Sequence, residues 1–167
     1  PLKLLRGLLL HADNSGYYLV WPEAKYYLKR RHEADDGQKY VCPKGHKRPL
    51  LTLTGGRESL LLVEGELNAL SFNVAVPSNS IASPGSAGNF TANNLRKSLT
   101  YLKKFDKIVI VADDDRAGAE GAINAFQFLT QERLPVVGVW LMREDANDIL
   151  TKYGKTELFK RTMARLS

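Results

Sequence analysis

From residue 59 onward, short continuous apolar runs alternate with segments whose apolar residues are spaced three and four apart. The continuous runs predict buried strands, and the spaced segments predict amphipathic helices. Strands alternating with helices in this way are typical of a parallel sheet covered on both faces. The predicted fold class is therefore α/β, with a parallel sheet of about four strands flanked by helices. We expect strands at 59–65, within 78–88, at 107–113 and at 135–142, and helices at 66–74, 89–105, 117–133 and near 155–166.

The front of the chain has a different pattern. Aromatic and β-branched residues cluster in "GYYLVWPEAKYYLKRRHE", residues 16–33, around a turn at 22–24. A second extended stretch, "KYVCPKGHKRPLLTL", covers 39–53. Short runs of this composition predict a small antiparallel sheet. We therefore divide the chain into a small basic β-rich subdomain, 1–56, and an α/β domain with a C-terminal helix, 57–167.

Composition places the protein among soluble globular chains. Of its 167 residues, 44% are hydrophobic and 25% are charged, which argues against wholesale disorder. No apolar run approaches the roughly 18 to 20 residues that a membrane helix requires. The single cysteine, Cys42, excludes an internal disulfide and fits a reducing compartment. We expect a cytoplasmic protein without membrane contact, and the first residue, Pro1, suggests a piece cut from a longer chain.

The net charge of +6 belongs mainly to the front of the chain. Residues 1–56 hold ten lysines and arginines against five acidic residues, whereas residues 57–167 hold fourteen against thirteen. Such a bias suggests a polyanionic partner, because basic side chains neutralise phosphates and release counterions. A basic surface kept for solubility explains the same bias, and charge alone leaves both interpretations open.

Acidic residues follow two of the expected strands directly. Glu64 comes after "LLLV", and three aspartates, 113–115, come after "IVIVA". In an open parallel sheet the carboxyl ends of strands face a crevice where ligands bind, and strand alternation turns Asp113 and Asp115 to the same side. Converging carboxylates repel one another unless a cation lies between them, and oxygen-only ligands suit Mg²⁺. Capping of the next helix is the alternative; it explains one aspartate well and three poorly.

The segment "LLLVEGELNAL", followed some fifty residues later by "IVIVADDDRAGAEGA", resembles the paired signature of Toprim domains, over residues 58–150. The resemblance implies a Toprim, Rossmann-like sheet that uses Mg²⁺ or Mn²⁺. It implies that Glu64 is a general base or metal ligand and that Asp113 and Asp115 bind metal. Asp145, in "REDANDIL", matches a further metal contact, and for Asp148 we favour helix capping.

The front portion resembles the basic sheet that phage primase-helicases place before their Toprim domain. The implied activity is that of a DNA primase-type catalytic fragment, which synthesises short RNA primers on single-stranded DNA from nucleoside triphosphates, beside a replicative helicase. Arg116 would contact phosphate or pair with Asp114. The other phosphate or nucleotide contacts that the likeness implies are Lys29, Arg30, Lys39, Lys44, Lys47 and Arg48.

Two other functions remain open at this stage. A Toprim nuclease or topoisomerase would use the same metals to cut DNA, although no tyrosine stands in a recognisable catalytic context. A noncatalytic nucleic-acid-binding module is favoured by Asn68, which occupies a position where the primase pattern usually has an aspartate. Cys42 and His46 do not predict a zinc site, because no second pair of ligands accompanies them.

Overall fold

The chain forms two compact units, Pro1–Leu51 and Thr52–Ser167. The computed structural model describes the side chains of residues 50–53, 55, 56 and 58–166. Nearer the front, it describes the backbone of 4, 5, 8–13, 16–21, 27–31, 40 and 41. The two units are presented separately below.

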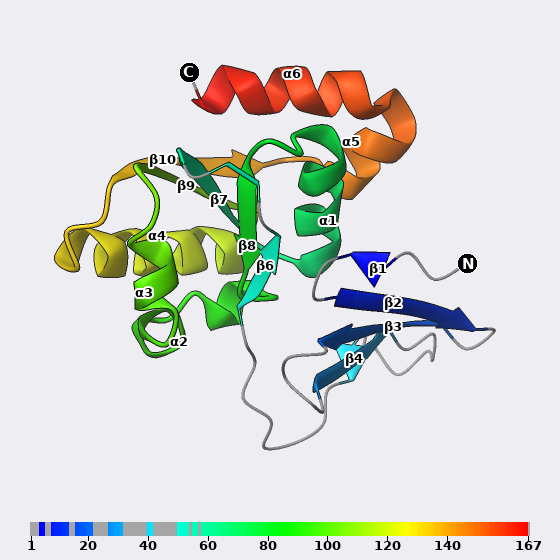
Figure 1. Cartoon of the computed structure of the whole chain (residues 1–167), viewed down its shortest axis with the longest axis horizontal. Coiled ribbons are helices and arrows are strands. Elements are labelled where there is room, and N and C mark those ends of the chain that lie inside the picture. The colour runs from blue at the N-terminus through cyan, green and yellow to red at the C-terminus, as the bar shows by residue number, and fades with distance from the viewer. Residues whose placement is uncertain are drawn as a thin grey trace. The chain divides into compact units, whose positions relative to one another are not determined.

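The first unit contains the antiparallel sheet that the sequence predicts. Its strands follow one another in chain order, and each pairs antiparallel with the next. The expected turn at 22–24 lies outside the described residues. The strands are β1 (Leu4–Leu5), β2 (Leu8–Asp13), β3 (Gly16–Trp21), β4 (Tyr27–Arg31) and β5 (Tyr40–Val41) (Figure 1).

The second unit is built on a five-stranded sheet in the order β10-β9-β7-β8-β6. The four strands that the sequence predicts all form, and the pairs β10–β9, β9–β7 and β7–β8 are parallel. The central strands are almost wholly buried, which agrees with their unbroken apolar sequences. The strands are β6 (Leu51–Leu53), β7 (Ser59–Val63), β8 (Ser80–Ser83), β9 (Lys107–Asp113) and β10 (Val136–Met142).

Strand β6 is the one that the sequence analysis did not assign to this sheet. Its leucines, Leu51 and Leu53, are buried and alternate with the partly exposed Thr52, the pattern of an edge strand with one face on a core. The Ser80 hydroxyl accepts from Gly55 N at 3.1 Å and donates to Gly56 O at 2.7 Å. These bonds tie the end of β6 to the start of β8, so the sheet gains a fifth strand.

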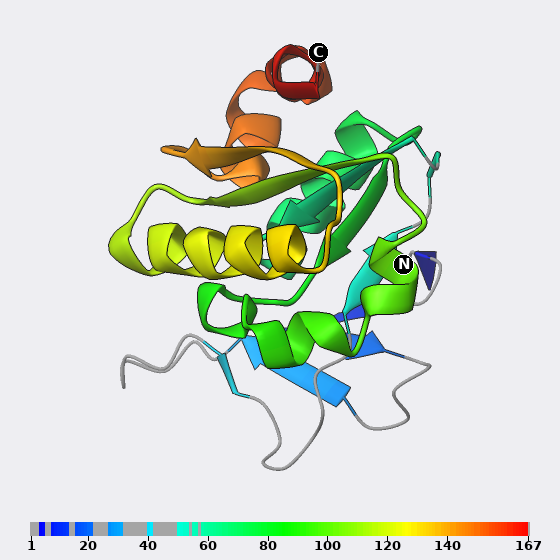
Figure 2. The ribbon, with the colours of Figure 1, turned by 90° about the vertical axis from the view of Figure 1, so that its left-hand side faces the viewer.

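Helices cover both faces of the sheet. Helix α4 packs on β9 and β10 along one face, and α1 packs on β7 and β8 on the other, where it also contacts α5 and α6 (Figure 2). None of the helices in the described part of the chain combines the length and the apolar character that crossing a membrane requires. The helices are α1 (Glu66–Ala75), η2 (Ala87–Asn89), α2 (Ala92–Arg96), α3 (Leu99–Leu102), α4 (Arg116–Gln131), α5 (Ala146–Tyr153) and α6 (Lys155–Leu166).

The single helix expected at 89–105 is replaced by η2, α2 and α3. Thr91 starts α2, since its hydroxyl accepts a hydrogen bond from Asn94 N at 3.3 Å. Serine, threonine and asparagine compete with helical hydrogen bonds through such local contacts, which explains why the segment breaks. The apolar spacing was still a correct guide to burial, because Leu95 and Leu102 are both in the core.

Candidate functional site

Three neighbouring strands bring acidic residues together at the carboxyl end of the sheet. Glu64 follows β7, Asp113 ends β9, and Asp145 lies just beyond β10. The hydrogen-bond ladder continues past the strand ends: Glu64 N donates to Val111 O at 2.7 Å, and Asp114 N donates to Met142 O at 2.9 Å. Because the strands are parallel and adjacent, their carboxyl ends form one acidic rim.

The Glu64 carboxylate is held by backbone hydrogen bonds. Its Oε1 accepts from Ala87 N at 2.9 Å, and its Oε2 accepts from Asp113 N at 3.2 Å. Burial raises the pKa of Glu64, while the hydrogen bonds from Asp113 and Ala87 act in the opposite direction. The carboxylate is thus fixed between the end of β9 and the loop at η2, close to Asp113.

Asp113 has the most perturbed carboxyl group of the rim. Burial, together with the negative charges of Glu64, Asp145 and Asp115, raises its pKa from the ordinary value of 3.8 to about 7. Each of these carboxylates is therefore near enough to Asp113 to disfavour its ionised form. A bound cation would reverse this effect, since it stabilises the ionised carboxylates.

The neighbouring aspartates have different surroundings. Asp115 is the N-cap of α4, and its Oδ1 accepts from Gly118 N at 2.7 Å. A side chain at Gly118 would collide with the Asp113 carbonyl oxygen, so this glycine allows the tight turn from β9 into α4. Asp114 Oδ2 lies 3.4 Å from Arg143 Nε. Capping and metal binding remain compatible for Asp115, because the capping bond engages one carboxylate oxygen.

Arg116 does not pair with Asp114, one of the two roles considered for it. Its Nε donates to Glu120 Oε1 at 2.9 Å, one turn along α4, and its side chain is 92% exposed. An exposed ion pair of this kind contributes little to stability. Arg116 therefore remains accessible to an anionic ligand at the start of the helix.

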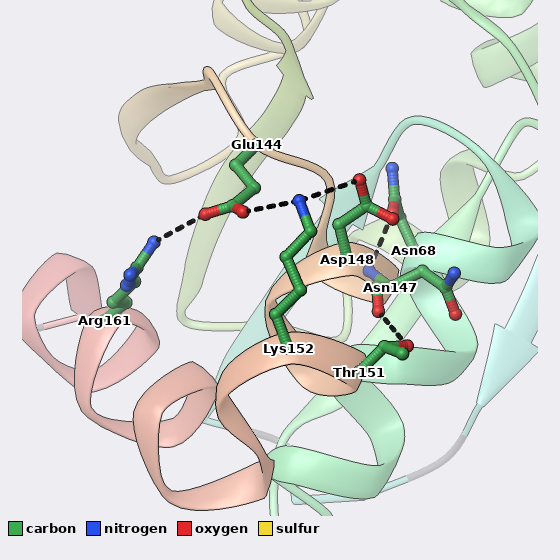
Figure 3. Close-up of polar contacts among 7 residues, drawn as sticks. All are labelled: Asn68, Glu144, Asn147, Asp148, Thr151, Lys152 and Arg161. Carbon is green, nitrogen blue, oxygen red and sulfur yellow. Dashed lines mark hydrogen bonds and ion pairs between the residues drawn. The ribbon is translucent and has the colours of Figure 1, made fainter.

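Asn68 connects two parts of the rim. It is only 8% exposed; its Nδ2 donates to Glu64 O at 3.4 Å, and its Oδ1 accepts from Asn147 N at 3.3 Å. Asp145 is the N-cap residue of α5, but its side chain makes no capping bond. The first turn of α5 is thus capped by a side chain from α1, as Figure 3 shows for Asn68 and Asn147.

Asp148 belongs to a surface ion-pair network rather than to a cap. Its Oδ2 lies 3.6 Å from Lys152 Nζ, which also donates to Glu144 Oε1 at 3.1 Å. Glu144 reaches α6 through Arg161, whose Nη1 lies 3.4 Å from Glu144 Oε2 (Figure 3). This network links α5 to α6 beside the rim.

The small-residue turn after β8 lies against Glu66 of α1, a residue that the sequence pattern did not single out as part of the site. Gly85 has a φ of +96°, and a side chain there would come within 2.8 Å of Glu66 Oε1. Glu66 is a buried carboxylate, only 3% exposed. Its signal in the sequence was the second glutamate of "EGE", which we had assigned only to the start of a helix. The turn therefore needs glycine both for its backbone conformation and for the space occupied by Glu66.

An open pocket of about 840 Å³ adjoins the rim at Asp114. Three guanidinium groups line it, those of Arg143, Arg161 and Arg165. Arg165 stacks over the Trp140 ring at 5.8 Å, and within the described part of the chain it has no carboxylate partner. We call this feature the arginine pocket.

The donor atoms of the rim suit a hard divalent cation. Glu64, Asp113, Asp115 and Asp145 offer only carboxylate oxygens, the preferred ligands of Mg²⁺. As the side chains stand, no three His, Cys, Asp or Glu residues within the described ranges form a ready ligand group. Two features fit a bound cation: several negative charges surround Asp113, and the Asp145 side chain makes no capping hydrogen bond to its helix.

The basic residues expected to contact nucleic acid are described only in part. Lys29 and Arg30 lie in β4, where they pair with Leu19 and Tyr18 of β3. The remaining ones, Lys39, Lys44, Lys47 and Arg48, lie outside the described residues, as do Cys42 and His46.

A family model for Toprim-like proteins matches residues 61–150. This match covers more than half of the chain, and the protein therefore belongs to the Toprim-like family. No curated protein matches it. Within the family, the fold is that of the primase type, as comparison with solved structures shows.

Three solved structures illustrate this likeness. The primase fragment of the bacteriophage T7 primase-helicase protein aligns with a TM-score of 0.64 and 20% identity, over 93% of this chain and 66% of that one. A DNA primase domain from Pseudomonas aeruginosa gives 0.61 and 16%, over 96% and 55%. The RNA polymerase domain of the Mycobacterium tuberculosis primase gives 0.54 and 19%, over 95% and 58%. The chain thus spans between about half and two thirds of these structures, and at such identities the likeness concerns the fold.

Proposed function

We propose that this protein is the catalytic part of a DNA primase, which synthesises short RNA primers on single-stranded DNA by metal-dependent nucleotidyl transfer. The observation that carries the proposal is the convergence of carboxylates at the ends of three adjacent parallel strands, with the pKa of Asp113 raised to about 7 by burial and by its acidic neighbours. Such a site is built for cations and polyphosphates.

Each carboxylate has a proposed role in this reaction. Asp113, Asp115 and Asp145 would hold Mg²⁺ or Mn²⁺, with Glu64 as a further ligand. When bound, the metal would neutralise charge on the phosphates of the incoming triphosphate. Glu64 would alternatively accept the proton of the attacking 3′-hydroxyl; its raised pKa supports this second role, because a base works best when its pKa approaches the working pH.

Basic side chains would hold the template and the triphosphate tail. The exposed position of Arg116 at the start of α4 supports a phosphate contact, since anions bind favourably at helix N-termini. The arginine pocket supports a path for a phosphate backbone next to the rim. In the front unit, the proposed contacts are Lys29, Arg30, Lys39, Lys44, Lys47 and Arg48, within the most basic part of the sequence.

The proposed partners are single-stranded DNA, nucleoside triphosphates and a replicative helicase. One similar solved structure is described as part of a primase-helicase protein, and another contains primase domains bound to an RNA/DNA hybrid and dTTP. Those descriptions concern the other proteins. We extend them to this chain as part of the proposal.

The test is synthesis of labelled oligoribonucleotides on single-stranded DNA with Mg²⁺ or Mn²⁺. The native chain should make short products, and the variant with both Asp113→Ala and Asp115→Ala should make none, because it loses two of the proposed metal ligands. Far-ultraviolet circular dichroism of the variant should match that of the native chain. Full activity in the double variant would exclude this site.

The same samples distinguish the other two functions. Metal-dependent scission of the DNA, with no primers formed, would indicate a nuclease or topoisomerase activity. DNA binding without synthesis or scission would indicate a noncatalytic module.

A further inference from the structure

We infer that Asn68 is a positioning residue of the carboxylate rim: from α1 it caps the first turn of α5 and thereby holds the Asp145 carboxylate beside Glu64 and Asp113. The inference rests on the proposed metal-dependent function, and it concerns a residue that touches neither the substrate nor the metal in that proposal.

The first turn of α5 is capped by Asn68 and not by its own N-cap residue. The N–H groups in the first turn of a helix lack partners within the helix, and the N-cap side chain normally satisfies one of them. Asp145 holds the N-cap position of this helix, but its side chain makes no such bond. Asn68 Oδ1 instead accepts from Asn147 N at 3.3 Å. The Asp145 carboxylate is therefore not used as a cap and remains available at the rim.

The amide nitrogen of Asn68 makes a second contact, to the residue after β7. Asn68 Nδ2 donates to Glu64 O at 3.4 Å, so one side chain joins the residue after β7 to the start of α5. Both hydrogen bonds are long, but Asn68 is only 8% exposed and few water molecules compete for its polar atoms. The amide thus sets the spacing between Glu64 and the segment that carries Asp145.

The choice of side chain at this position also matters. An ionised aspartate accepts hydrogen bonds but donates none, so it would keep the contact with Asn147 N and lose the contact with Glu64 O. It would also add a negative charge next to carboxylates that already raise the pKa of Asp113. Asparagine is the side chain that bonds to both partners. Its presence here is consistent with an intact site and does not by itself indicate a lost activity.

Helix α5 should stay folded when Asn68 is replaced. Ala146 and Ile149 are almost fully buried, and α5 packs on both α1 and α6. We therefore expect Asn68→Ala to loosen the first turn of α5 while the helix stays in place. The matched control is Asn147→Ala, because Asn147 is exposed and contributes only its backbone N–H to the contact with Asn68.

The experiment measures the affinity of the full chain for Mn²⁺ by electron paramagnetic resonance, without nucleotide or DNA. Asn68→Ala should weaken Mn²⁺ binding by about tenfold, the usual size of an effect on ligand orientation, and Asn147→Ala should leave it unchanged. A double-mutant cycle then tests the route. In an Asp145→Ala background, Asn68→Ala should have little further effect, because the two residues act through one contact.

The outcomes separate this inference from the proposed function. Equal Mn²⁺ affinity of the native chain and Asn68→Ala, or an undiminished effect of Asn68→Ala in the Asp145→Ala background, would overturn the positioning role even if the native chain makes primers. Conversely, the expected cycle in a chain that makes no primers would support the positioning role and overturn the primase proposal. A native chain that binds no Mn²⁺ would overturn both.

Discussion

Asp113 is the residue at which the fold and the proposed chemistry make opposing demands. Its backbone N–H donates to Glu64, while its side chain is crowded by negative charge and partly removed from water. In the absence of a cation, ionisation of this carboxyl group is a cost to the folded state. The residue that is proposed to bind metal should therefore destabilise the metal-free protein.

This cost predicts a dependence of stability on pH. The pKa of Asp113 is about 7 in the folded chain and 3.8 in its ordinary environment, so the folded state holds the proton more tightly. The group contributes full stability below about pH 4 and loses it as pH rises to about 7. In EDTA, Asp113→Asn should remove much of this decline and raise the free energy of unfolding at pH 8 by on the order of 2 kcal/mol.

Urea unfolding at pH 5 and pH 8 measures the difference. Asp106→Asn is the control, because Asp106 is an exposed carboxylate near the other end of β9. Excess Mg²⁺ at pH 8 should stabilise the native chain and not the Asp113 variant. An unchanged pH dependence in Asp113→Asn would show that the carboxyl group is not strained by its neighbours.

The sequence predicted the acidic residues of the rim but not what holds them. Glu64 and Asp113 stand directly after apolar strands, so their convergence follows from the parallel order of those strands. The hydrogen bond from the Ala87 backbone N–H to Glu64 cannot be predicted from the residue types, because every residue except proline has a backbone N–H. Asn68 was noticed only as a departure from a pattern, because its bond to Asn147 joins residues 79 positions apart.

At the scale of elements, continuous strands were easier to predict than interrupted helices. Strands β7 and β9 each contain an unbroken run of buried residues, 60–63 and 108–112, whereas the segment 89–105 has helical spacing and local capping residues that divide it. Strand β6 was assigned to the wrong sheet because three residues after a proline carry too little pattern to choose a partner. Its partner β8 is decided by the glycines and Ser80 that join them.

The arginine pocket belongs to this scale, since it lies between β10, α5 and α6. If it carries a phosphate backbone, Arg165→Gln should weaken binding of single-stranded DNA and reduce the slope of log affinity against log salt by about 0.7. Lys103→Gln is the matched control: it removes one charge from an exposed position at the end of α3. Fluorescence anisotropy at several salt concentrations gives both slopes. Equal slopes for the two variants would remove the pocket from the proposed DNA path.

At the scale of the whole molecule, the chain combines a basic front unit with a nearly neutral α/β unit. This division of charge is what the proposal requires, because one unit would supply phosphate contacts and the other the carboxylates. The boundary between the units decides which fragment is able to fold alone. The sequence suggested a boundary after residue 56, whereas the compact units divide between Leu51 and Thr52.

Isolated α/β fragments that start before or after β6 should differ in stability. A fragment of residues 50–167 keeps β6, whose Leu51 and Leu53 are 1% and 3% exposed, while a fragment of residues 57–167 loses both leucines and leaves β8 as an open edge. Burial of two leucines contributes on the order of 4 kcal/mol, and an uncovered edge strand promotes association. The shorter fragment should therefore unfold at lower urea concentration and elute partly as aggregates in size-exclusion chromatography. If both fragments unfold at the same urea concentration and stay monomeric, β6 is dispensable for folding, and the boundary after residue 56 is the better description. The four parallel strands would then be sufficient to hold the carboxylate rim.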